Sequence, residues 1–311
     1  MTTFKIQGRD LLSLHNFAPD EIDTILQFAG DLKYRQKRGE PHSYLHGKTL
    51  GMIFQKPSTR TRVSFEVAMY QLGGYALHLN PADLQLGRGE TIADTARVLS
   101  RYLDGIMIRT FAQEDVEEFA RHADIPVING LTDLLHPCQI LADLLTIQEK
   151  KGFLEGLKLA YVGDGNNICH SLLFGCAKTG VNISVASPEN YRPKPEIVEL
   201  ARQDAQNKNS RIDIFTDPAE AVKEADVVVT DVWASMGQES VAAQKAAVFA
   251  GYQVNHALVK DAKEDFIFLH CLPAHRGEEV AADIIDGPHS VVWDEAENRL
   301  HTQKAVLAML L

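Results

Sequence analysis

Residues 50–62 read LGMIFQKPSTRTR, a short apolar run followed by a polar segment that is rich in hydroxyls and arginines and opens a helical pattern. Short apolar runs alternate in this way with helix-length amphipathic stretches almost from end to end of the chain. This alternation is typical of an α/β protein with parallel sheets. The runs expected to form strands are residues 50–54, 75–79, 104–109, 126–129, 157–164, 181–187, 211–216, 225–233 and 265–273.

Helices are expected between these strands, because apolar residues recur there at helical spacing. The clearest recurrences are Val63, Val67 and Tyr70; Ile92, Ala96 and Leu99; and Ile140, Leu144 and Ile147. Thr91, with Asp94 three residues later, indicates a capping box at the start of the second of these helices.

The composition excludes several classes of protein. The chain is 45% hydrophobic and 23% charged, which excludes a disordered or collagen-like chain. The net charge of −11 disfavours broad binding to nucleic acid or to an acidic membrane, since both need a basic face. Four cysteines without a CxxC pair predict neither a disulfide framework nor a structural zinc site. The N-terminus lacks a secretory or mitochondrial leader pattern and no apolar run approaches a membrane span, so a soluble, cytoplasmic protein is expected.

The length of 311 residues exceeds what one compact core usually holds, so we expect two domains. A polar, glycine-containing segment at residues 148–156 separates two strand–helix series of similar length. The pattern therefore predicts a first domain at residues 1–148 and a second at residues 149–293, each with a central parallel sheet flanked by helices. Residues 294–311 are expected to form a C-terminal helix that packs back toward the first domain. A small-molecule site is expected in a cleft between the domains.

Residues 56–62 carry the strongest chemical signal. In open α/β sheets, ligands bind beyond the carboxyl ends of the strands, and a helix N-terminus there attracts anions. Ser58, Thr59 and Thr61 add hydroxyl donors, and Arg60 adds a planar guanidinium that suits phosphate oxygens. The alternative interpretation is a helix cap at Ser58 followed by solvated arginines. A cap accounts for Ser58 alone, so the segment predicts a phosphate site.

Three further positions in the first half are candidates. His136 and Gln139 lie on one side of a helical turn that Pro137 suits, where they can hold a carbonyl oxygen and an amide group. A capping histidine and a solvent-facing glutamine fit the same pattern equally well. Arg109 ends a predicted strand, and we expect it to point toward the ligand edge of the sheet.

In the second half, polar residues again follow predicted strands. Asp231 can meet a cationic substrate group, and Ser235 with Met236 offers a hydroxyl and backbone N–H groups. Cys271 ends a strand, where a cysteine is more often a small buried hydrophobe than a nucleophile. Residues 163–167 read GDGNN and suggest a dinucleotide turn, but the third glycine of that motif falls on Ile168. A dehydrogenase is therefore disfavoured.

Taken together, these segments resemble the carbamoyltransferase family over essentially the whole chain. Residues 58–62 match the carbamoyl-phosphate motif of the family, and residues 136–139 match its second motif. Residues 231–237 and 270–273 match signatures of the ornithine-type members, which the aspartate-type members lack.

The resemblance implies a role for each matched residue. The phosphate would be held by Ser58, Thr59, Arg60 and Thr61, with Gln85 supplied by a neighbouring subunit. The carbamoyl group would be bound by Arg109, His136, Gln139, Arg299 and the backbone at Cys271 and Leu272. Ornithine would be bound at its α-amino and carboxylate end by Ser235, Met236 and one of two neighbouring asparagines, Asn167 or the alternative Asn166. Asp231 and Cys271 would bind its side-chain amine.

The implied reaction is transfer of the carbamoyl group from carbamoyl phosphate to the side-chain amine of L-ornithine, giving L-citrulline and phosphate. No metal or organic cofactor is implied, and the implied assembly is a trimer, or a multiple of trimers, with shared active sites. Asp231 would orient the amine, with Cys271 or the departing phosphate as proton acceptor. Two alternatives stay open, namely a carbamoyltransferase for putrescine or an N-acylornithine and a non-catalytic protein that binds phosphorylated metabolites. The sequence also leaves open whether the reaction serves arginine synthesis or ornithine-dependent catabolism.

Overall fold

The computed structural model describes residues 6–86, 88–234 and 242–311. Each of the nine apolar runs singled out in the sequence forms a strand, and the strands assemble into two separate parallel sheets of four and five strands. The chain divides into two compact units, one made of residues up to Leu145 together with Glu297–Leu311, and the other of Thr146–Ala296.

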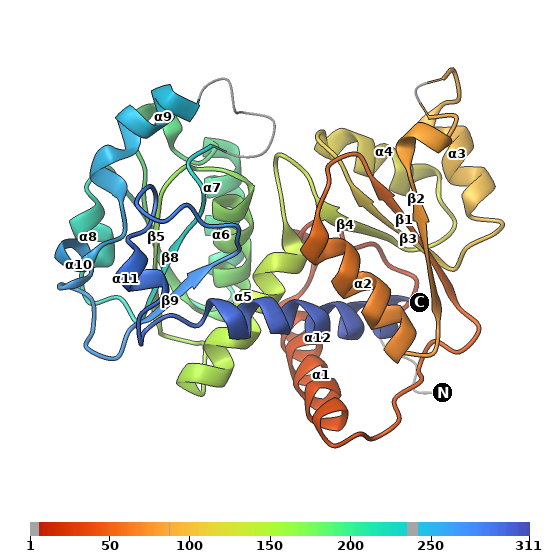
Figure 1. Cartoon of the computed structure of the whole chain (residues 1–311), viewed down its shortest axis with the longest axis horizontal. Helices are drawn as coiled ribbons and strands as arrows, with labels where there is room; N and C mark the ends of the chain where they lie inside the picture. Colours follow the sequence, from red (N-terminus) through yellow and green to blue (C-terminus); the bar gives the residue numbers. More distant parts are fainter. Residues whose placement is uncertain (1–5, 87, 235–241) are drawn as a thin grey trace. The chain divides into compact units, whose positions relative to one another are not determined.

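The sheet of the first unit contains β1 (Thr49–Phe54), β2 (Tyr75–Leu79), β3 (Gly105–Arg109) and β4 (Val127–Leu131) in the spatial order β2-β1-β3-β4. All neighbours are parallel, with Leu50 of β1 level with Ala76 of β2 and Gly105 of β3. Helices α3 (Ile92–Leu99) and α4 (Gln113–His122) lie beside this sheet (Figure 1). The apolar cluster beneath them contains Ile53, Ile106, Ile108, Ala96, Val116 and Phe119. Thr91 caps α3 by accepting a hydrogen bond from the N–H of Asp94 at 3.0 Å.

Helix α2 (Thr59–Gln71) forms where the sequence pattern predicts it, but its apolar stripe is not its buried face. The buried residues of α2 include Phe65, Ala68 and Met69. Val63 and Tyr70 are 51% and 80% exposed. Helical spacing locates a helix, but it does not say which of two apolar stripes packs on its own sheet. The stripe of Val63 and Tyr70 is therefore left exposed on the single chain.

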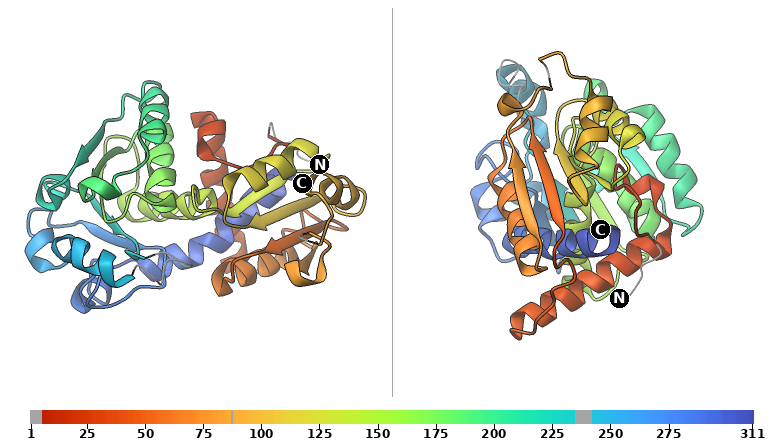
Figure 2. Two further views of the ribbon diagram at one scale, coloured as in Figure 1. Left: turned by 90° about the horizontal axis from the view of Figure 1, so that it is seen from above. Right: turned by 90° about the vertical axis from the view of Figure 1, so that its right-hand side faces the viewer.

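The first unit also contains α1 (Pro19–Lys37), the start of α5 (Pro137–Lys151) and most of α12 (Val292–Leu310), with short 3-10 turns at Leu14–Asn16 and Pro81–Asp83. The C-terminal part of α12 runs beside α1 (Figure 2). Lys33 of α1 donates to Asn298 of α12 at 2.7 Å, and Lys304 of α12 donates to Gln36 of α1 at 2.5 Å. The expected C-terminal helix is confirmed, and it begins at Val292 rather than at residue 294.

The sheet of the second unit contains β5 (Lys158–Val162), β6 (Asn182–Ala186), β7 (Ile212–Phe215), β8 (Val227–Thr230) and β9 (Ile267–His270). Their spatial order is β7-β6-β5-β8-β9, again all parallel. Helices α6 (Asn167–Thr179) and α7 (Pro195–Ala205) lie on one side of β5 and β8, and α8 (Pro218–Val222) and α10 (His256–Val259) lie on the other (Figure 1). Other elements among the described residues of this unit include α9 (Ala242–Phe249), α11 (Ala282–Ile285) and 3-10 turns at Glu189–Tyr191 and Ala250–Tyr252. Phe249, Phe268 and Val228 belong to the core of this unit.

Strand order decides where each unit presents polar residues. In the first unit the chain moves outward from β1 to β2 and then returns to place β3 on the other side of β1. In the second unit the same reversal separates β5 from β8. Ligands bind in such sheets outside the carboxyl ends of the strands at the reversal, because the connections there diverge to opposite faces. The segments after β1, β3, β5 and β8 are therefore where a site is expected.

No helix in the described part of the chain is long and apolar enough to cross a membrane.

Candidate functional site

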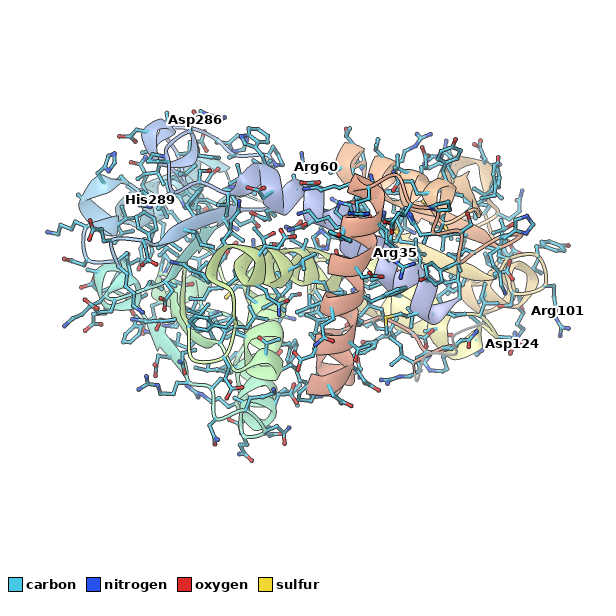
Figure 3. All side chains as sticks on the ribbon, turned by 90° about the horizontal axis from the view of Figure 1, so that it is seen from below. Arg35, Arg60, Arg101, Asp124, Asp286 and His289 are labelled. Carbon is cyan, nitrogen blue, oxygen red and sulfur yellow. The ribbon has the colours of Figure 1, made fainter. Side chains whose placement is uncertain are left out.

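In the first unit, the N-terminus of α2 follows β1 directly. The hydroxyl of Ser58 caps this helix by accepting a hydrogen bond from the N–H of Thr61 at 3.2 Å. Thr59 begins the helix, and Arg60 projects from its first turn (Figure 3). The first N–H groups of a helix have no partner within the helix, and the helix dipole gives them positive character. This end of α2 can therefore receive an anion.

Three arginines lie close enough to His136, the residue before α5, to interact with it electrostatically. His136 is buried, and burial is the largest cause that lowers the pKa of its imidazole well below the usual range. The positive charges of Arg299, Arg109 and Arg60 lower it further. The ring is therefore neutral near pH 7 and can donate one hydrogen bond without adding charge. Positive charges from three distant parts of the sequence thus act on one uncharged hydrogen-bond donor, the His136 ring. This combination suits an anion that carries a carbonyl group.

Arg299 joins three helices of the first unit. One terminal nitrogen donates to Oε1 of Gln139 and the other to Oγ1 of Thr61, both at 2.8 Å. The amide nitrogen of Gln139 donates in turn to Asp143 at 2.8 Å, so the amide oxygen faces Arg299. Arg299 lies in the interior of α12. Arg109 ends β3 as predicted and is buried.

Sequence reasoning missed a buried cation beside this cluster. Lys56 forms an ion pair with Asp133, and its ammonium lies 4.3 Å from the centre of the Phe111 ring. The pair ties the loop after β1 to the loop that leads to His136. The position of Lys56 within the phosphate segment was the signal available in the sequence. Gln85, by contrast, is exposed in the loop after the Pro81–Asp83 turn.

In the second unit, Asp231 follows β8 and is buried. Its Oδ1 accepts hydrogen bonds from the thiol of Cys271 at 3.1 Å and from the N–H of Val232 at 2.8 Å. Its Oδ2 accepts from the amide nitrogen of Asn166 at 2.7 Å. Cys271 follows β9 and is half-buried. The structure therefore brings the two candidate catalytic residues of this unit into contact.

The two neighbouring asparagines occupy different positions. Asn166 caps α6, and its Oδ1 accepts from the N–H groups of Ile168 and Cys169 at 3.0 and 3.2 Å. Asn167 is the first residue of α6. Asn166 is the one that contacts Asp231, which sequence reasoning did not anticipate. Ser235 and Met236 lie outside the described residues.

A buried histidine supports the backbone beside Cys271. The N–H of Leu272, a residue with a left-handed φ of +58°, donates to Nδ1 of His270 at 2.9 Å. Nε2 of His270 then donates to Glu279 at 3.2 Å, and both side chains are fully buried. Burial favours the neutral acid, but bonds from His270 and the N–H of His275 hold the pKa of Glu279 below its usual value. Sequence reasoning missed Glu279.

Among the described residues of the second unit, the Asp231 cluster does not suit a metal, and the turn at residues 163–167 does not suit a dinucleotide. Donor atoms of Asp231, His270 and Cys271 lie within 4.8 Å of one another. Both ring nitrogens of His270 are already engaged, however, with Leu272 and Glu279, and Asp231 is bonded to Cys271, so each of the three side chains already has a hydrogen-bond partner. In the GDGNN turn, a Cβ on Gly165 would lie 2.2 Å from the nitrogen of Pro193. That glycine therefore serves the close approach of the chain's own backbone.

A second buried pair fixes the same turn. Lys245 of α9 forms an ion pair with Asp164 at 2.5 Å, and both side chains are largely buried. Burial raises the pKa of Asp164, and the hydrogen bond from Lys245 opposes that rise. The pair ties α9 to the turn between β5 and α6.

Comparisons with known proteins match each half of the chain to a family. Residues 9–149 match the family described as aspartate/ornithine carbamoyltransferase, carbamoyl-P binding domain. Residues 155–310 match the one described as aspartate/ornithine carbamoyltransferase, Asp/Orn binding domain. The chain is 61% identical over 306 residues to an ornithine carbamoyltransferase of Pyrococcus horikoshii, covering 98% of this chain and 96% of that one. It is 59% identical over 306 residues to an anabolic ornithine carbamoyltransferase of Pyrococcus furiosus, covering 98% and 97%. A solved ornithine carbamoyltransferase structure from P. furiosus superposes with a TM-score of 0.96 at 58% identity, covering 100% of this chain and 98% of that one.

Proposed function

Because this chain belongs to the aspartate/ornithine carbamoyltransferase family, we propose that it transfers the carbamoyl group of carbamoyl phosphate to the side-chain amine of L-ornithine. The products are L-citrulline and phosphate. The observation that carries the proposal is the bonding of Arg299 to both Gln139 and Thr61, which brings the N-terminus of α2 together with the helix that follows His136. A non-catalytic phosphometabolite-binding protein would need the arginines, but it would not need the Asp231–Cys271 pair of the second unit.

The phosphate group binds at the N-terminus of α2. Ser58, Thr59 and Thr61 offer hydroxyls there, and Arg60 offers a planar fork that matches phosphate oxygens. The same contacts stabilise the phosphate as it departs with its negative charge, so binding and leaving-group stabilisation use one set of donors.

The carbamoyl carbonyl is polarised by Arg109 and His136. As the carbon becomes tetrahedral, its oxygen gains negative charge, and donors already aimed at it need no reorganisation. Losing one such donor typically costs about 3–4 kcal/mol of transition-state stabilisation. Arg299 fixes the amide oxygen of Gln139, which accepts a hydrogen bond from the carbamoyl NH2.

Ornithine is bound by the second unit, with its side-chain amine near Asp231 and Cys271. An alkyl ammonium has a pKa of about 10.4 in water, so the amine must lose a proton before it can attack the carbonyl carbon. The carboxylate of Asp231 orients the amine. Because the Cys271 thiol donates to Oδ1 of Asp231 at 3.1 Å, it can pass its own proton to that carboxylate as its sulfur accepts one from the amine. The departing phosphate is the other acceptor. Asn167 and the Ser235–Met236 segment bind the amino-acid end.

The proposed assembly is a trimer, or a multiple of trimers, in which Gln85 of a neighbouring subunit completes the phosphate site. Two features of the first unit support it. The exposed stripe of α2 (Val63 and Tyr70) is followed in the sequence by exposed apolar residues, Tyr75 and Leu77, on the edge strand β2. Apolar surface of this kind marks interfaces between proteins. In the described chain Gln85 is exposed, where it is available to a second subunit.

We propose that the protein works in the cytoplasm. We also propose that it works in the direction of citrulline formation. The four cysteines of the described chain are free thiols, which suits a reducing compartment. One of the relatives above is named as anabolic, and we propose the same direction for this chain.

The test is to incubate the purified protein with carbamoyl phosphate and to measure the ureido product from ornithine, putrescine, N-acetylornithine and aspartate in parallel. A strong preference for ornithine is the expected result. Preference for another amine would overturn the assignment of the second unit and retain that of the first. Binding of carbamoyl phosphate without product from any amine would favour the non-catalytic alternative.

A further inference from the structure

Asn166 contacts both the end of helix α6 and the carboxylate of Asp231. Its Oδ1 accepts from the N–H groups of Ile168 and Cys169, and its Nδ2 donates to Oδ2 of Asp231 at 2.7 Å. A flipped amide would set its NH2 against two N–H donors and its oxygen against a carboxylate. The orientation of the Asn166 amide is therefore determined by its surroundings.

The carboxylate of Asp231 is held at both oxygens. Oδ1 faces Cys271 and the N–H of Val232, and Oδ2 faces Asn166. The Val232 bond comes from the adjacent residue, so it restrains the carboxylate only locally. The Asn166 bond comes from a helix end that follows a different strand, β5, beside β8 in the sheet (Figure 1). That bond ties the rotation of the carboxylate to the frame of the sheet.

We propose that Asn166 is the positioning residue for Asp231. Its amide NH2 sets the plane of the carboxylate so that Oδ1 faces the Cys271 thiol and the substrate amine. The inference rests on the proposed function, because it explains how Asp231 is oriented for that reaction. It gives Asn166 two roles that can be separated, since the cap uses the oxygen and the positioning uses the nitrogen.

The ionisable groups around Asp231 are consistent with an uncharged donor, the Asn166 amide, at Oδ2 of this carboxylate. Cys271 is in direct contact, and Tyr161 and Asp164 lie close enough to interact electrostatically. Burial, with a contribution from Asp231, raises the pKa of Tyr161 well above its usual value, so its hydroxyl stays protonated. That hydroxyl donates to Oδ1 of Asn166 at 3.3 Å and to the carbonyl of Asp164 at 2.8 Å. Asp164 is itself paired with Lys245.

Two substitutions separate the roles. Asn166→Asp retains a carboxylate oxygen for the cap, and aspartate caps helices as well as asparagine does. It replaces the donor to Asp231 by a second carboxylate, and two carboxylates at this distance share a proton. Asn166→Ser also retains a cap but removes the donor without adding charge. A residue that only capped α6 would tolerate Asn166→Ser, which adds no charge beside Asp231.

The experiment measures kcat/KM for ornithine from pH 6 to 10, together with the KM for carbamoyl phosphate and the thermal midpoint. We expect kcat/KM to fall about 10- to 150-fold at pH 7.5 in both variants, the range for loss of a hydrogen bond to a charged group. In Asn166→Asp the acidic limb of the profile should move to higher pH, and in Asn166→Ser it should not. The KM for carbamoyl phosphate should change less than threefold. The matched control is Asn255→Asp, a cap of α10 that bonds the N–H of Leu258, and it should leave the profile unchanged.

A readout without turnover keeps this inference distinct from the proposed function. Cys271 is the one partly exposed cysteine of the four, so the rate of its alkylation by iodoacetamide can be followed against pH by peptide mass spectrometry. The added carboxylate in Asn166→Asp should slow alkylation at pH 8 relative to the wild type, because it disfavours the thiolate. If the wild type makes no citrulline, the proposed function fails while the alkylation profile still tests Asn166. Wild-type kinetics and alkylation in Asn166→Asp would overturn the inference.

Discussion

Replacing Arg299 by lysine tests whether the planar guanidinium, and not merely its charge, organises the anion site. The two terminal nitrogens of Arg299 reach Thr61 and Gln139 at 2.8 Å each, and the side chain is buried. A lysine ammonium carries its three N–H donors on one nitrogen at the end of a flexible stem, so it cannot reproduce the spacing of this planar fork. At least one of the two buried acceptors therefore loses its charged donor.

The expected loss follows from that geometry. One hydrogen bond to a charged group is worth about 1.5–3 kcal/mol, which corresponds to a fall of about 10- to 150-fold in kcat/KM for carbamoyl phosphate. The KM for ornithine should change much less, because the residues proposed to bind ornithine belong to the other unit. Initial rates with each substrate varied in turn give both constants, and a thermal melt checks that the first unit remains folded.

The control for this change is Arg35→Lys. Arg35 projects from α1 (Figure 3) and pairs with Asp31 one turn away at 2.8 Å, and both side chains are more than a third exposed. Such an exposed ion pair contributes little to stability, so this variant should retain kcat/KM within twofold of the wild-type value. A kcat/KM of Arg299→Lys for carbamoyl phosphate within twofold of the wild-type value would refute the reasoning, since it would show that the fork between Thr61 and Gln139 is not needed.

Three further predictions concern the thiol, the assembly and a buried cation. Cys271→Ser should lower kcat about 100-fold, a typical contribution of proton transfer, and a pH profile identical to the wild type would remove the thiol from that step. Arg60→Ala and Gln85→Ala should each be inactive alone, and refolding them together should restore part of the activity; no recovery would argue for sites built within single chains. Burial lowers the pKa of Lys304 from 10.5 to about 8, so the unfolded chain binds more protons than the folded one between those values, and wild-type stability rises with pH across that window. The stability of Lys304→Met relative to the wild type should therefore fall by about 3 kcal/mol between pH 7 and pH 10, as measured by urea unfolding, and a difference that does not vary with pH would contradict the buried charge.

The architecture could be predicted because strands and helices leave local periodic signals. Each of the nine apolar runs forms a strand, and the alternation with helices is enough to indicate parallel sheets. The helix starts at Thr59 and Pro137 could likewise be located, because a capping residue or a proline at the first position is a local feature. The phosphate segment falls in the same category, since hydroxyls and an arginine at one helix end are adjacent in the sequence.

The face of α2 shows where local signals stop being sufficient. Its sequence carries one apolar stripe through Val63 and Tyr70 and another through Phe65 and Met69. Both stripes have helical spacing, so periodicity alone cannot rank them. Packing on the sheet selected the second stripe, and the first is left exposed on the surface of the single chain.

The sequence by itself determined the fold class and the residues that follow each strand, because both depend on patterns spanning a few neighbouring residues. Only the tertiary structure decided which of those residues meet. Arg299 bonds Gln139 and Thr61 across 160 and 238 residues of chain, and Asn166 bonds Asp231 across 65. These contacts depend on the strand orders β2-β1-β3-β4 and β7-β6-β5-β8-β9, which bring the ends of non-consecutive strands together. No local pattern encodes that order, because it results from packing the whole of each sheet against its helices.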